Sequence, residues 1–517
     1  MTRIDPSLTQ TIWDLAIVGG GATGLGVALQ AALQGHRVLL IEQRDFASGT
    51  SSRSTKLLHG GVRYLAQGHW SLVTEALRER TTVLGLAPHL AQPLSFVVVP
   101  SGPLSWWRMG IGLKLYQWLS GRMSLGPTRR VTAAEMDQLL PRRTHKGAGL
   151  RYWDGQFEDA RYALSLAQSA RDQGATLLNH MQLVGLRAQA GQAGWQLALQ
   201  DALDGARLTV QARAVVNATG VWVDEVRSAA RQSGAALAGS APSRLVRPSQ
   251  GVHIVVPHET LPLREAVLIP ETEDGRVLFA IPWLGSTVIG TTDTEREDAP
   301  KEPRPTPDEI QFLLRETERW LGVRLSTSDV RSVWVGLRPL VQNPSNSEAR
   351  SSQVSREHVI LRESPGLVTV TGGKWTTYRR MAEQVLDALR QAGDLPAPLR
   401  DGQTRTQVLH GSPRPGEVVS LHQAPGLHLW GTQAAELQQA PGASLGMGLT
   451  EAMVRHSARH EWAVTVEDML ARRWRALFLD AREAERMAPE VARILQDETG
   501  LDPQLAAFMT LCRQYRL

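Results

Sequence analysis

The spacing of hydrophobic residues near the start of the chain predicts a strand, a helix and a second strand. Residues 15–18 form a short apolar run that ends in glycines, as a buried parallel strand does. Residues 22–34 have helical character, and one face carries leucines four residues apart: Leu25, Leu29 and Leu33. Gly35 ends this helix, and residues 38–41 form the second strand. The pattern therefore predicts a βαβ unit.

Alternating polar and apolar residues predict a sheet-rich middle of the chain. Residues 195–199 and 206–212 alternate around Asp204 and Gly205, which predicts a β-hairpin. Further apolar runs predict strands at residues 215–216, 251–256, 276–281, 287–289 and 367–370. Helices are expected at residues 308–321 and from the glycine turn at 371–374 through residue 390. Beyond residue 394 prolines interrupt the chain, and residues 451–491 look continuously helical.

Length, charge and cysteine content narrow the class of protein. A chain of 517 residues exceeds one hydrophobic core, so two or three domains are expected. The 56 basic side chains outnumber the 51 acidic ones by only five, which gives no reason to expect nucleic-acid binding. Cys512 is the only cysteine, so a disulfide, a Cys-rich metal site and a dithiol relay are excluded within one chain. We expect no metal and a reducing compartment.

Two segments raise the question of membrane contact. Residues 15–36 carry no formal charge and are long enough for a membrane span, but their six glycines fit a strand–turn–helix better. No secretory signal is expected, because Asp5 and Asp14 interrupt the start. Residues 106–119 place apolar side chains at helical spacing beside basic ones, which fits either an interfacial helix or a helix packed on its own domain.

The first glycine turn matches the dinucleotide-binding fingerprint in its expected context. Gly19 permits a tight turn after the strand, Gly21 lets the backbone approach a pyrophosphate, and Gly24 allows close helix–strand packing. The helix that follows presents its N-terminus to the anion. Glu42 ends the second strand, where an acid accepts hydrogen bonds from ribose hydroxyls. These features predict a bound dinucleotide.

Three further segments favour FAD over NAD. Residues 48–56 are rich in hydroxyl groups, which are typical either of a solvated loop or of a segment that lines a long cofactor. Ala218 and Gly220 end a strand with small residues, as a close approach to a ligand requires. Gly372, Gly373 and Lys374 repeat this turn and add a cation, which would stabilise a reduced, anionic flavin. Two remote glycine turns suit FAD.

The chain resembles the aerobic, FAD-dependent glycerol-3-phosphate dehydrogenases of the glycine-oxidase-like flavoprotein superfamily. The matching segments are residues 17–24 (IVGGGATG), 50–65 (TSSRSTKLLHGGVRYL), 215–222 (VVNATGVW), 251–257 (GVHIVVP), 281–283 (IPW), 289–293 (IGTTD), 336–340 (GLRPL) and 371–378 (TGGKWTTY). They cover residues 14 to about 390 in order. The resemblance implies oxidation of glycerol 3-phosphate to dihydroxyacetone phosphate by hydride transfer to flavin N5, with electrons passed to a membrane quinone.

The resemblance also implies the residues of the site. Catalytic roles fall to His253, Arg338, Lys374 and His59, with either histidine as the base. Substrate binding falls to Arg63, Tyr64, His253, Arg338 and Lys374, with the two arginines as the phosphate clamp. Cofactor binding falls to Gly19, Gly21, Gly24, Glu42, Thr50, Ser51, Ser52, Ser54, Lys56, Leu57, Ala218, Gly220, Gly372, Gly373, Lys374, Trp375 and Thr376.

These observations predict an α/β and α+β fold with three domains. A Rossmann-like FAD-binding domain takes residues 1–100, 150–235 and 336–393, a β-sheet substrate-binding domain takes 101–149 and 236–335, and a C-terminal helical domain takes 394–517. We expect a homodimer in the cytoplasm, peripheral on the inner face of the cytoplasmic membrane. The alternatives are an oxygen-reducing α-glycerophosphate oxidase, a flavin amine or amino-acid oxidase, and a non-catalytic FAD-binding scaffold.

Overall fold

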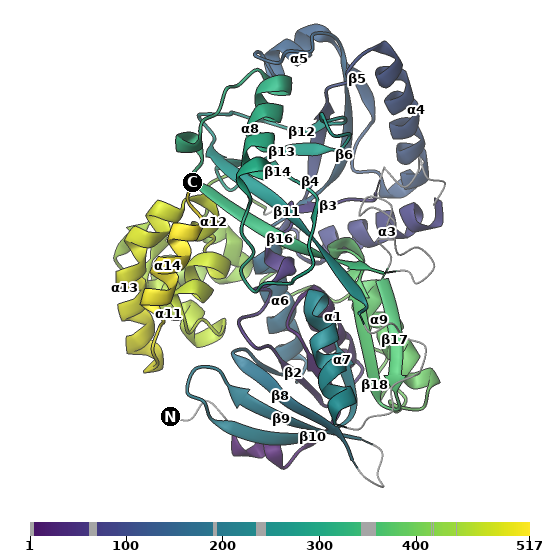
Figure 1. Cartoon of the computed structure of the whole chain (residues 1–517), viewed down its shortest axis with the longest axis vertical. Helices are drawn as coiled ribbons and strands as arrows, with labels where there is room; N and C mark the ends of the chain where they lie inside the picture. The colour runs from purple at the N-terminus through teal and green to yellow at the C-terminus, as the bar shows by residue number, and fades with distance from the viewer. Residues whose placement is uncertain are drawn as a thin grey trace.

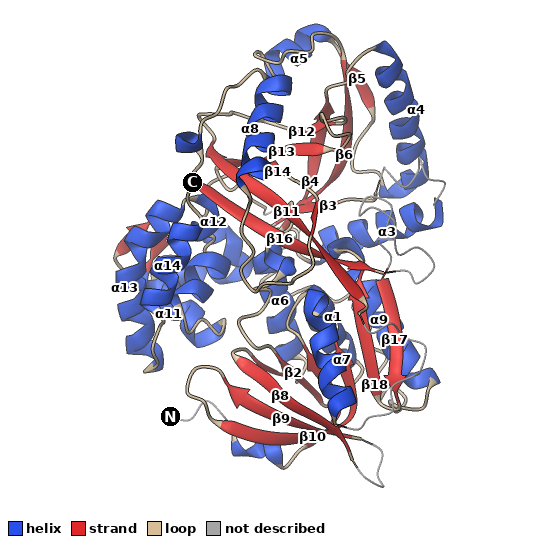
Figure 2. Ribbon diagram, viewed as in Figure 1, coloured by secondary structure: helices blue, strands red, loops and turns tan. Residues whose placement is uncertain are grey.

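Two large β-sheets and a helical C-terminal domain make up the chain. The computed structural model describes residues 5–61, 70–189, 194–233, 244–342, 358–414, 416, 418–440 and 442–517. One sheet lies below the other in Figure 1, and the yellow C-terminal helices lie beside both. Figure 2 shows helices on the faces of the lower sheet and around the edges of the upper one. The predicted α/β and α+β architecture is confirmed.

The lower sheet contains the predicted βαβ unit. Its strands run in the order β17 (His358–Ser364), β18 (Leu367–Gly372), β10 (Arg207–Asn217), β1 (Ile12–Val18), β2 (Val38–Ile41) and β7 (Thr176–Leu178). Strands β1 and β2 are parallel, and α1 (Ala22–Leu33) connects them. Every residue of β2 is buried, as the continuous apolar run predicts. Helices α6 (Asp159–Asp172), α7 (Val223–Gln232) and α9 (Tyr378–Gln391) complete this layer.

The predicted hairpin is confirmed and extends the same sheet. Strand β9 (Trp195–Asp201) pairs antiparallel with the first half of β10, and β8 (Met181–Ala188) pairs with β9. The second half of β10 then pairs parallel with both β1 and β18. One long strand therefore joins the hairpin to the dinucleotide unit, and its carboxyl end lies beside that of β1.

The upper sheet is mixed and has ten strands among the described residues. Its order is β15 (Thr294–Glu295), β11 (Val246–Pro257), β14 (Ser286–Gly290), β13 (Leu278–Trp283), β12 (Ala266–Ile269), β4 (Ala91–Val98), β6 (Gly149–Phe157) and β3 (Leu57–Leu58), with β16 (Ser332–Val341) on β11 and β5 (Arg129–Val131) on β6. Its helices are α3 (Trp70–Leu86), α4 (Pro103–Ser120), α5 (Ala133–Leu139) and α8 (Pro307–Leu321). Within the described part of the chain, no helix combines the length and low polarity needed to cross a bilayer.

Two predicted boundaries need correction. Strands β3, β4, β6 and the second half of β16 fall in the segments assigned to the FAD-binding domain. They belong to the upper sheet, because β4 pairs with β12, β6 with β4, β3 with β6 and β16 with β11. The helix expected over residues 451–491 is broken into α11 (Glu451–His460), a π-helical turn (Asp468–Arg473), α12 (Ala476–Leu479) and the start of α13 (Ala481–Thr499). Trp462 and Arg475 adopt positive φ at the breaks. The aliphatic spacing did not reveal these breaks, because buried ion pairs to other domains hold them.

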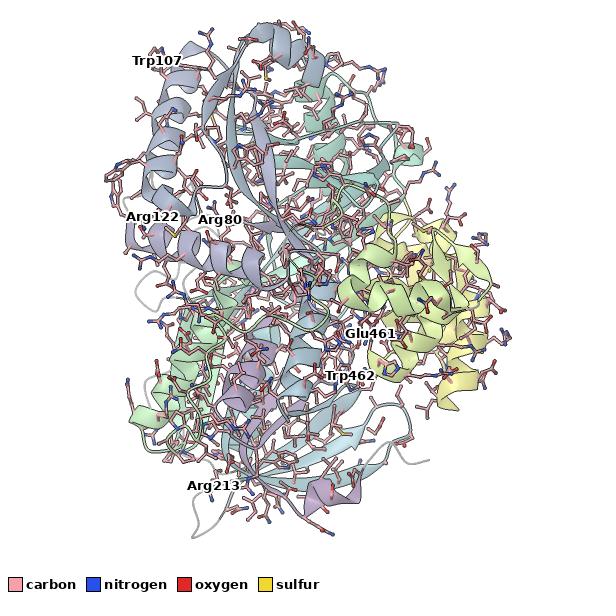
Figure 3. All side chains as sticks on the ribbon, turned by 180° about the vertical axis from the view of Figure 1, so that it is seen from behind. Arg80, Trp107, Arg122, Arg213, Glu461 and Trp462 are labelled. Carbon is pink, nitrogen blue, oxygen red and sulfur yellow. The ribbon has the colours of Figure 1, made fainter. Side chains whose placement is uncertain are left out.

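The remaining C-terminal elements are a 3-10 segment (Leu427–Gln433), α10 (Ala434–Gln439), the short pair β19 (Ser444–Gly446) and β20 (Leu449–Thr450), and α14 (Leu505–Gln514). Among them, α14 and β19 pack against α13, and α10 packs against α11. Figure 3 shows Glu461 and Trp462 on the side of this domain that faces the rest of the chain. There the Glu461 carboxylate pairs with Arg161 of α6 at 2.6 Å, and both side chains are buried. The C-terminal domain is therefore docked through buried charges.

Candidate cofactor and active site

One cavity of about 2140 Å³ is lined by residues of both sheets. Gly19 after β1, Gly220 after β10 and Gly372 at the end of β18 line it from the lower sheet. His253 of β11 and Arg338 of β16 line it from the upper sheet. Small-molecule pockets usually hold about 300–1,000 Å³. The cavity therefore has room for an elongated dinucleotide together with a substrate.

The first glycine turn is shaped by contacts that leave no room for larger side chains. Gly19 has φ +110°, and a Cβ there would lie 2.6 Å from the carbonyl oxygen of Ala218. A Cβ on Gly24 would lie 1.9 Å from the carbonyl oxygen of Gly19. The backbone N–H of Ala22 donates to the Ser51 hydroxyl at 3.0 Å. The turn thus brings the N-terminus of α1 to the cavity, where its amides favour an anion.

Glu42 lies at the end of β2 and lines the cavity, as the fingerprint predicts. One carboxylate oxygen accepts the N–H of Gly20 at 2.7 Å, and the other accepts the N–H of Arg44 at 2.9 Å. These two bonds orient the carboxylate, because each oxygen has a fixed backbone donor. The second lone pair of each oxygen is the kind of acceptor that ribose hydroxyls require.

The two remote glycine turns meet beside the first one. Strands β10 and β18 are parallel, with Asn217 opposite Thr369, so both turns lie at the same edge of the sheet. The Thr371 hydroxyl donates to the carbonyl of Gly220 at 3.0 Å and ties the turns together. The Trp375 indole donates to the carbonyl of Ser51 at 2.8 Å. Three segments that lie far apart in sequence therefore form one wall.

The structure places the predicted site residues unevenly around the cavity. Those that line it are Gly19, Gly21, Glu42, Thr50, Ser51, Ser54, Leu57, His59, Ala218, Gly220, His253, Arg338, Gly372, Gly373, Lys374, Trp375 and Thr376. Gly24, Ser52 and Lys56 are not among the lining residues. Arg63 and Tyr64 fall outside the described residues, so their predicted substrate contacts stay predictions.

Lys56 needs a correction, because it points away from the cavity. Its side chain is fully buried, and Nζ pairs with Asp159 at 2.8 Å and donates to the carbonyl of Ser52 at 2.9 Å. The ammonium also lies 5.1 Å from the ring centre of Trp283. Burial lowers the pKa of Lys56 to about 7 despite the neighbouring carboxylate of Asp159. Its chemistry is therefore structural rather than cofactor binding.

His253 and Arg338 lie on neighbouring antiparallel strands and face the cavity. His253 is 2% exposed, its Nε2 lies 3.0 Å from the Thr55 hydroxyl, and its ring stacks on Trp334. Its strand neighbours Val252 and Ile254 belong to a hydrophobic core on the other face, as the alternation predicts. Burial, with the nearby cations Lys56 and Arg338, holds the pKa of His253 well below its usual range. The imidazole is therefore neutral at neutral pH.

The Arg338 guanidinium is held in place by several acceptors, one of which is the Gln250 carbonyl, 3.5 Å from Nη1. Nη1 pairs with Asp293 at 3.1 Å, and Nη2 donates to the Thr291 hydroxyl at 3.1 Å and to the Thr292 carbonyl at 3.2 Å. Gly251 makes this position possible, because a Cβ there would lie 2.6 Å from Nη2. A fixed, cavity-facing guanidinium is suited to bidentate contact with a phosphate.

Thr55 and Asp293 support the site, but the sequence did not single them out. Thr55 lies inside both the hydroxyl-rich segment and the matching segment at residues 50–65, and neither gave it a role. Asp293 ends the block at residues 289–293, whose glycine and threonines mark a turn rather than a role. Their contacts to His253 and Arg338 depend on strand register, which spacing along the chain does not reveal.

The residues present fit a flavin dinucleotide. The cavity joins the pyrophosphate-type turn at Gly19, the ribose-type acid Glu42 and the two remote glycine turns in one continuous space. Gly19 and Gly24 pack so closely against backbone carbonyls that no larger side chain fits the first turn. This fold and site define an FAD-dependent oxidoreductase.

Comparison with known proteins supports this classification as an FAD-dependent oxidoreductase and identifies the family. The sequence profile described as FAD dependent oxidoreductase matches residues 14–379, and the profile described as C-terminal domain of alpha-glycerophosphate oxidase matches residues 427–506. The chain belongs to the family of FAD-dependent glycerol-3-phosphate dehydrogenases. The predicted family, cofactor and enzyme class are thereby confirmed.

Three relatives illustrate the similarity. A mitochondrial glycerol-3-phosphate dehydrogenase of Arabidopsis thaliana is 38% identical, over 95% of this chain and 83% of the relative. The mitochondrial glycerol-3-phosphate dehydrogenase of Homo sapiens is 36% identical, over 95% of this chain and 71% of the relative. The crystal structure of a glycerol-3-phosphate dehydrogenase from Bacillus halodurans complexed with FAD superposes with a TM-score of 0.73 at 26% identity, covering 98% of this chain and 96% of that one.

Proposed function

We propose that this protein oxidises sn-glycerol 3-phosphate to dihydroxyacetone phosphate. The observation that carries the proposal is the meeting of His253 and Arg338 in the cavity that the FAD-type glycine turns line. The relatives are named for the same substrate. Oxidation of a secondary alcohol removes a hydride from carbon and a proton from oxygen. When bound, FAD supplies the hydride acceptor at N5.

The chain's own residues supply the remaining chemistry. Arg338 binds the phosphate dianion through a guanidinium that Asp293 and Thr291 already orient. His253 takes the hydroxyl proton on the ring nitrogen that carries the lone pair of its neutral, buried imidazole, and the Thr55 hydroxyl, 3.0 Å from Nε2, orients the ring. Lys374 adds a positive charge near the reaction. His59 lines the same cavity and is the alternative base.

An anaerobic mixing experiment tests the proposal. The FAD-loaded protein is mixed with sn-glycerol 3-phosphate, and absorbance is followed in the flavin band. Rapid bleaching is expected with glycerol 3-phosphate and not with glycerol. The half-saturating concentration is expected to rise at least tenfold in Arg338→Ala, because one charged hydrogen-bonding partner is worth about 1.5–3 kcal/mol. An FAD-loaded protein that glycerol 3-phosphate does not bleach contradicts the proposal, and amino acids would be tried next.

We further propose that the electrons leave to a membrane quinone rather than to oxygen. The match of residues 427–506 to a domain named for alpha-glycerophosphate oxidase makes oxygen the competing acceptor. Reoxidation of the reduced protein is measured with a soluble quinone analogue and with dissolved oxygen. The quinone is expected to react at least tenfold faster at equal concentration. Stoichiometric peroxide at a comparable rate would favour the oxidase.

We propose peripheral membrane contact through helix α4. It exposes large apolar side chains: Leu104, Trp107, Ile111 and Trp118, at 65–74% of their surface. Figure 3 shows Trp107 and Arg122 towards the two ends of this helix, on the outer side of the molecule. Arg108, Lys114 and Arg122 are exposed beside the apolar residues. Exposed tryptophans flanked by cations are suited to an anionic bilayer surface.

A sedimentation assay with anionic phospholipid vesicles tests this contact. Wild type is expected to sediment with the vesicles, and Trp107→Ser combined with Trp118→Ser to stay mostly in the supernatant. Leu399→Ser with Val408→Ser is the matched control, because both side chains are exposed apolar residues elsewhere in the chain. Equal sedimentation of wild type and the tryptophan variant would remove α4 from the contact. We also propose that the protein is a homodimer, located at the inner face of the cytoplasmic membrane. Light scattering measures the mass of the protein in solution and so tests the dimer.

A further inference from the structure

A buried cluster of charges joins the C-terminal helical domain to residues 50–56, here called the cofactor loop. Arg475, Lys56, Glu158 and Asp159 are all 0% exposed. Arg475 pairs with Glu158 at 3.0 Å and with Asp159 at 3.4 Å, and Lys56 pairs with Asp159 at 2.8 Å. Both cations donate to the same carbonyl, that of Ser52, at 2.8 and 2.9 Å. The cluster thus holds the loop backbone in place by hydrogen bonds from the side opposite the cavity.

The other side of the cofactor loop faces the active site. Thr50, Ser51, Ser54 and Thr55 line the cavity. The Thr55 hydroxyl is the hydrogen-bond partner of His253 Nε2 at 3.0 Å. Ser54 donates through its hydroxyl to Asp159 at 2.7 Å, so the loop is held on both sides of Arg53. A shift at Ser52 therefore moves Thr55 relative to the imidazole.

The C-terminal domain holds the loop at a second point. The Arg53 guanidinium forms two hydrogen bonds to Glu302, at 2.8 and 2.6 Å. The Tyr515 hydroxyl, two residues from the end of the chain, donates to the same carboxylate at 3.0 Å. The Tyr515 carbonyl accepts the N–H of Val333 on β16 at 2.9 Å. The domain thus reaches the loop directly through Arg475, which precedes α12, and through Glu302 from Tyr515, which follows α14.

From these contacts we infer that Arg475 is a positioning residue, through which the C-terminal domain sets the Thr55–His253 pair for proton abstraction. The inference rests on the proposed function for the reaction itself. Arg475 is not among the residues that line the cavity, and it acts through the Ser52 carbonyl and the loop. The guanidinium is itself fixed by Phe478, whose ring centre lies 3.9 Å away, and by the carbonyl of Ala471.

Charge balance explains why this position is sensitive. The cluster contains two basic and two acidic side chains in a dry interior, so Arg475 and protonated Lys56 together balance the two carboxylates. Loss of Arg475 alone leaves two buried carboxylates with one ammonium, and the loop must move or the carboxylates must take up a proton. Proton transfer depends steeply on geometry, since misplacement of about 1 Å can cost roughly 100-fold in rate.

The test uses a charge-balanced variant of the full-length, FAD-loaded protein. Arg475→Met with Glu158→Gln removes one cation and one carboxylate and keeps an acceptor for the N-terminus of α6. Arg493→Met with Glu490→Gln is the matched control, because this pair lies half-exposed on α13. The flavin reduction rate at saturating glycerol 3-phosphate is expected to fall at least tenfold in the first variant and less than twofold in the control. The half-saturating concentration is expected to stay within threefold in both.

Two further measurements separate positioning from general damage. Thr55→Val is expected to lose a similar factor, and its combination with Arg475→Met and Glu158→Gln to lose no more than the worse of the two. Hydrogen exchange of residues 50–58 is expected to rise in the first variant and not in the control. Arg475→Lys keeps the charge and is expected to reduce the flavin faster than the variant with Arg475→Met and Glu158→Gln, but more slowly than wild type. It replaces that double variant in the test if the double variant does not fold.

Three outcomes would count against the inference. An unchanged reduction rate in a folded, FAD-loaded Arg475 variant overturns it, as do losses that multiply when the Thr55 change is added. Unchanged hydrogen exchange at residues 50–58 overturns the anchoring itself. If wild type is not bleached by glycerol 3-phosphate, the proposed function fails, and the exchange comparison alone decides whether Arg475 anchors the loop.

Discussion

Replacement of Gly251 by alanine tests the role of Arg338 without changing any charge. Gly251 lies in the extended strand β11, opposite Gly336 of β16. A Cβ there would lie 2.6 Å from Arg338 Nη2 and 2.3 Å from the Thr291 hydroxyl. Ordinary contact begins at 3.4 Å, so the guanidinium must retreat by about 0.8 Å. The paired strands cannot separate locally, and the side chain therefore yields.

The displacement of the Arg338 guanidinium is expected to weaken substrate binding by an amount that can be worked out. It strains the 3.1 Å contacts of Arg338 with Asp293 and Thr291 and moves the guanidinium away from its place in the cavity. A hydrogen bond to a charged group is worth about 1.5–3 kcal/mol. One tenfold change in affinity corresponds to about 1.4 kcal/mol. Gly251→Ala is therefore expected to weaken glycerol 3-phosphate binding by roughly 10- to 100-fold.

The assay is a titration of anaerobic flavin reduction with glycerol 3-phosphate. The half-saturating concentration is expected to rise, and the limiting rate to change by less than threefold, because His253 is not displaced. Gly85→Ala is the control, since no described atom lies within 4 Å of a Cβ there and alanine suits helix α3. A Gly251→Ala protein that binds the substrate as tightly as wild type would refute the assignment of Arg338 to the phosphate.

Three more predictions test other parts of the structure. Gly24→Ala is expected to abolish FAD retention, because its Cβ would lie 1.9 Å from the Gly19 carbonyl; flavin content per chain measures this, and full occupancy contradicts it. The depressed pKa of His253 means that the pH profile of kcat/KM shows no ionisation of this residue between pH 6.5 and 8. If kcat/KM of wild type falls below about pH 7 and that of His253→Asn does not, the histidine titrates in this range and the prediction is wrong. Lys56 has a folded pKa of about 7 against 10.5 unfolded, so the unfolded chain binds more protons between these values and stability rises with pH. The difference in unfolding free energy between wild type and Lys56→Met is expected to grow by at most about 1.4 kcal/mol per pH unit from pH 7.5 to 9. A difference that stays constant with pH would place the ammonium pKa outside that range.

Local patterns were sufficient for the elements around the dinucleotide turn. The apolar run at residues 38–41 and strand β2 have the same bounds, and α1 begins at Ala22 as the fingerprint requires. A parallel strand buried on both faces is readable because nearly every residue in it must be apolar. The glycines at 19 and 24 are readable for a similar reason, since close backbone contacts exclude every larger side chain.

Patterns failed where distant segments decide the structure. Residues 451–491 have helical spacing, yet Arg475 adopts φ +66° because its guanidinium is drawn into a buried cluster with Glu158 and Asp159. Lys56 was predicted to bind the cofactor because the sequence does not show which way its side chain points. Its neighbours in sequence line the cavity, but the side chain turns the other way towards Asp159, about a hundred residues later in the chain.

The sequence by itself determined the dinucleotide unit, the FAD cofactor, the family and seventeen of the residues that line the cavity. These features depend on backbone conformation and on close packing within short segments, so they leave signals at fixed spacing. Only the tertiary structure decided that Thr55 faces His253, that Asp293 holds Arg338, and that the C-terminal domain grips the cofactor loop through Arg475. Those contacts join segments separated by up to several hundred residues, and they depend on strand register and on the pairing of buried charges, which spacing along the chain does not encode.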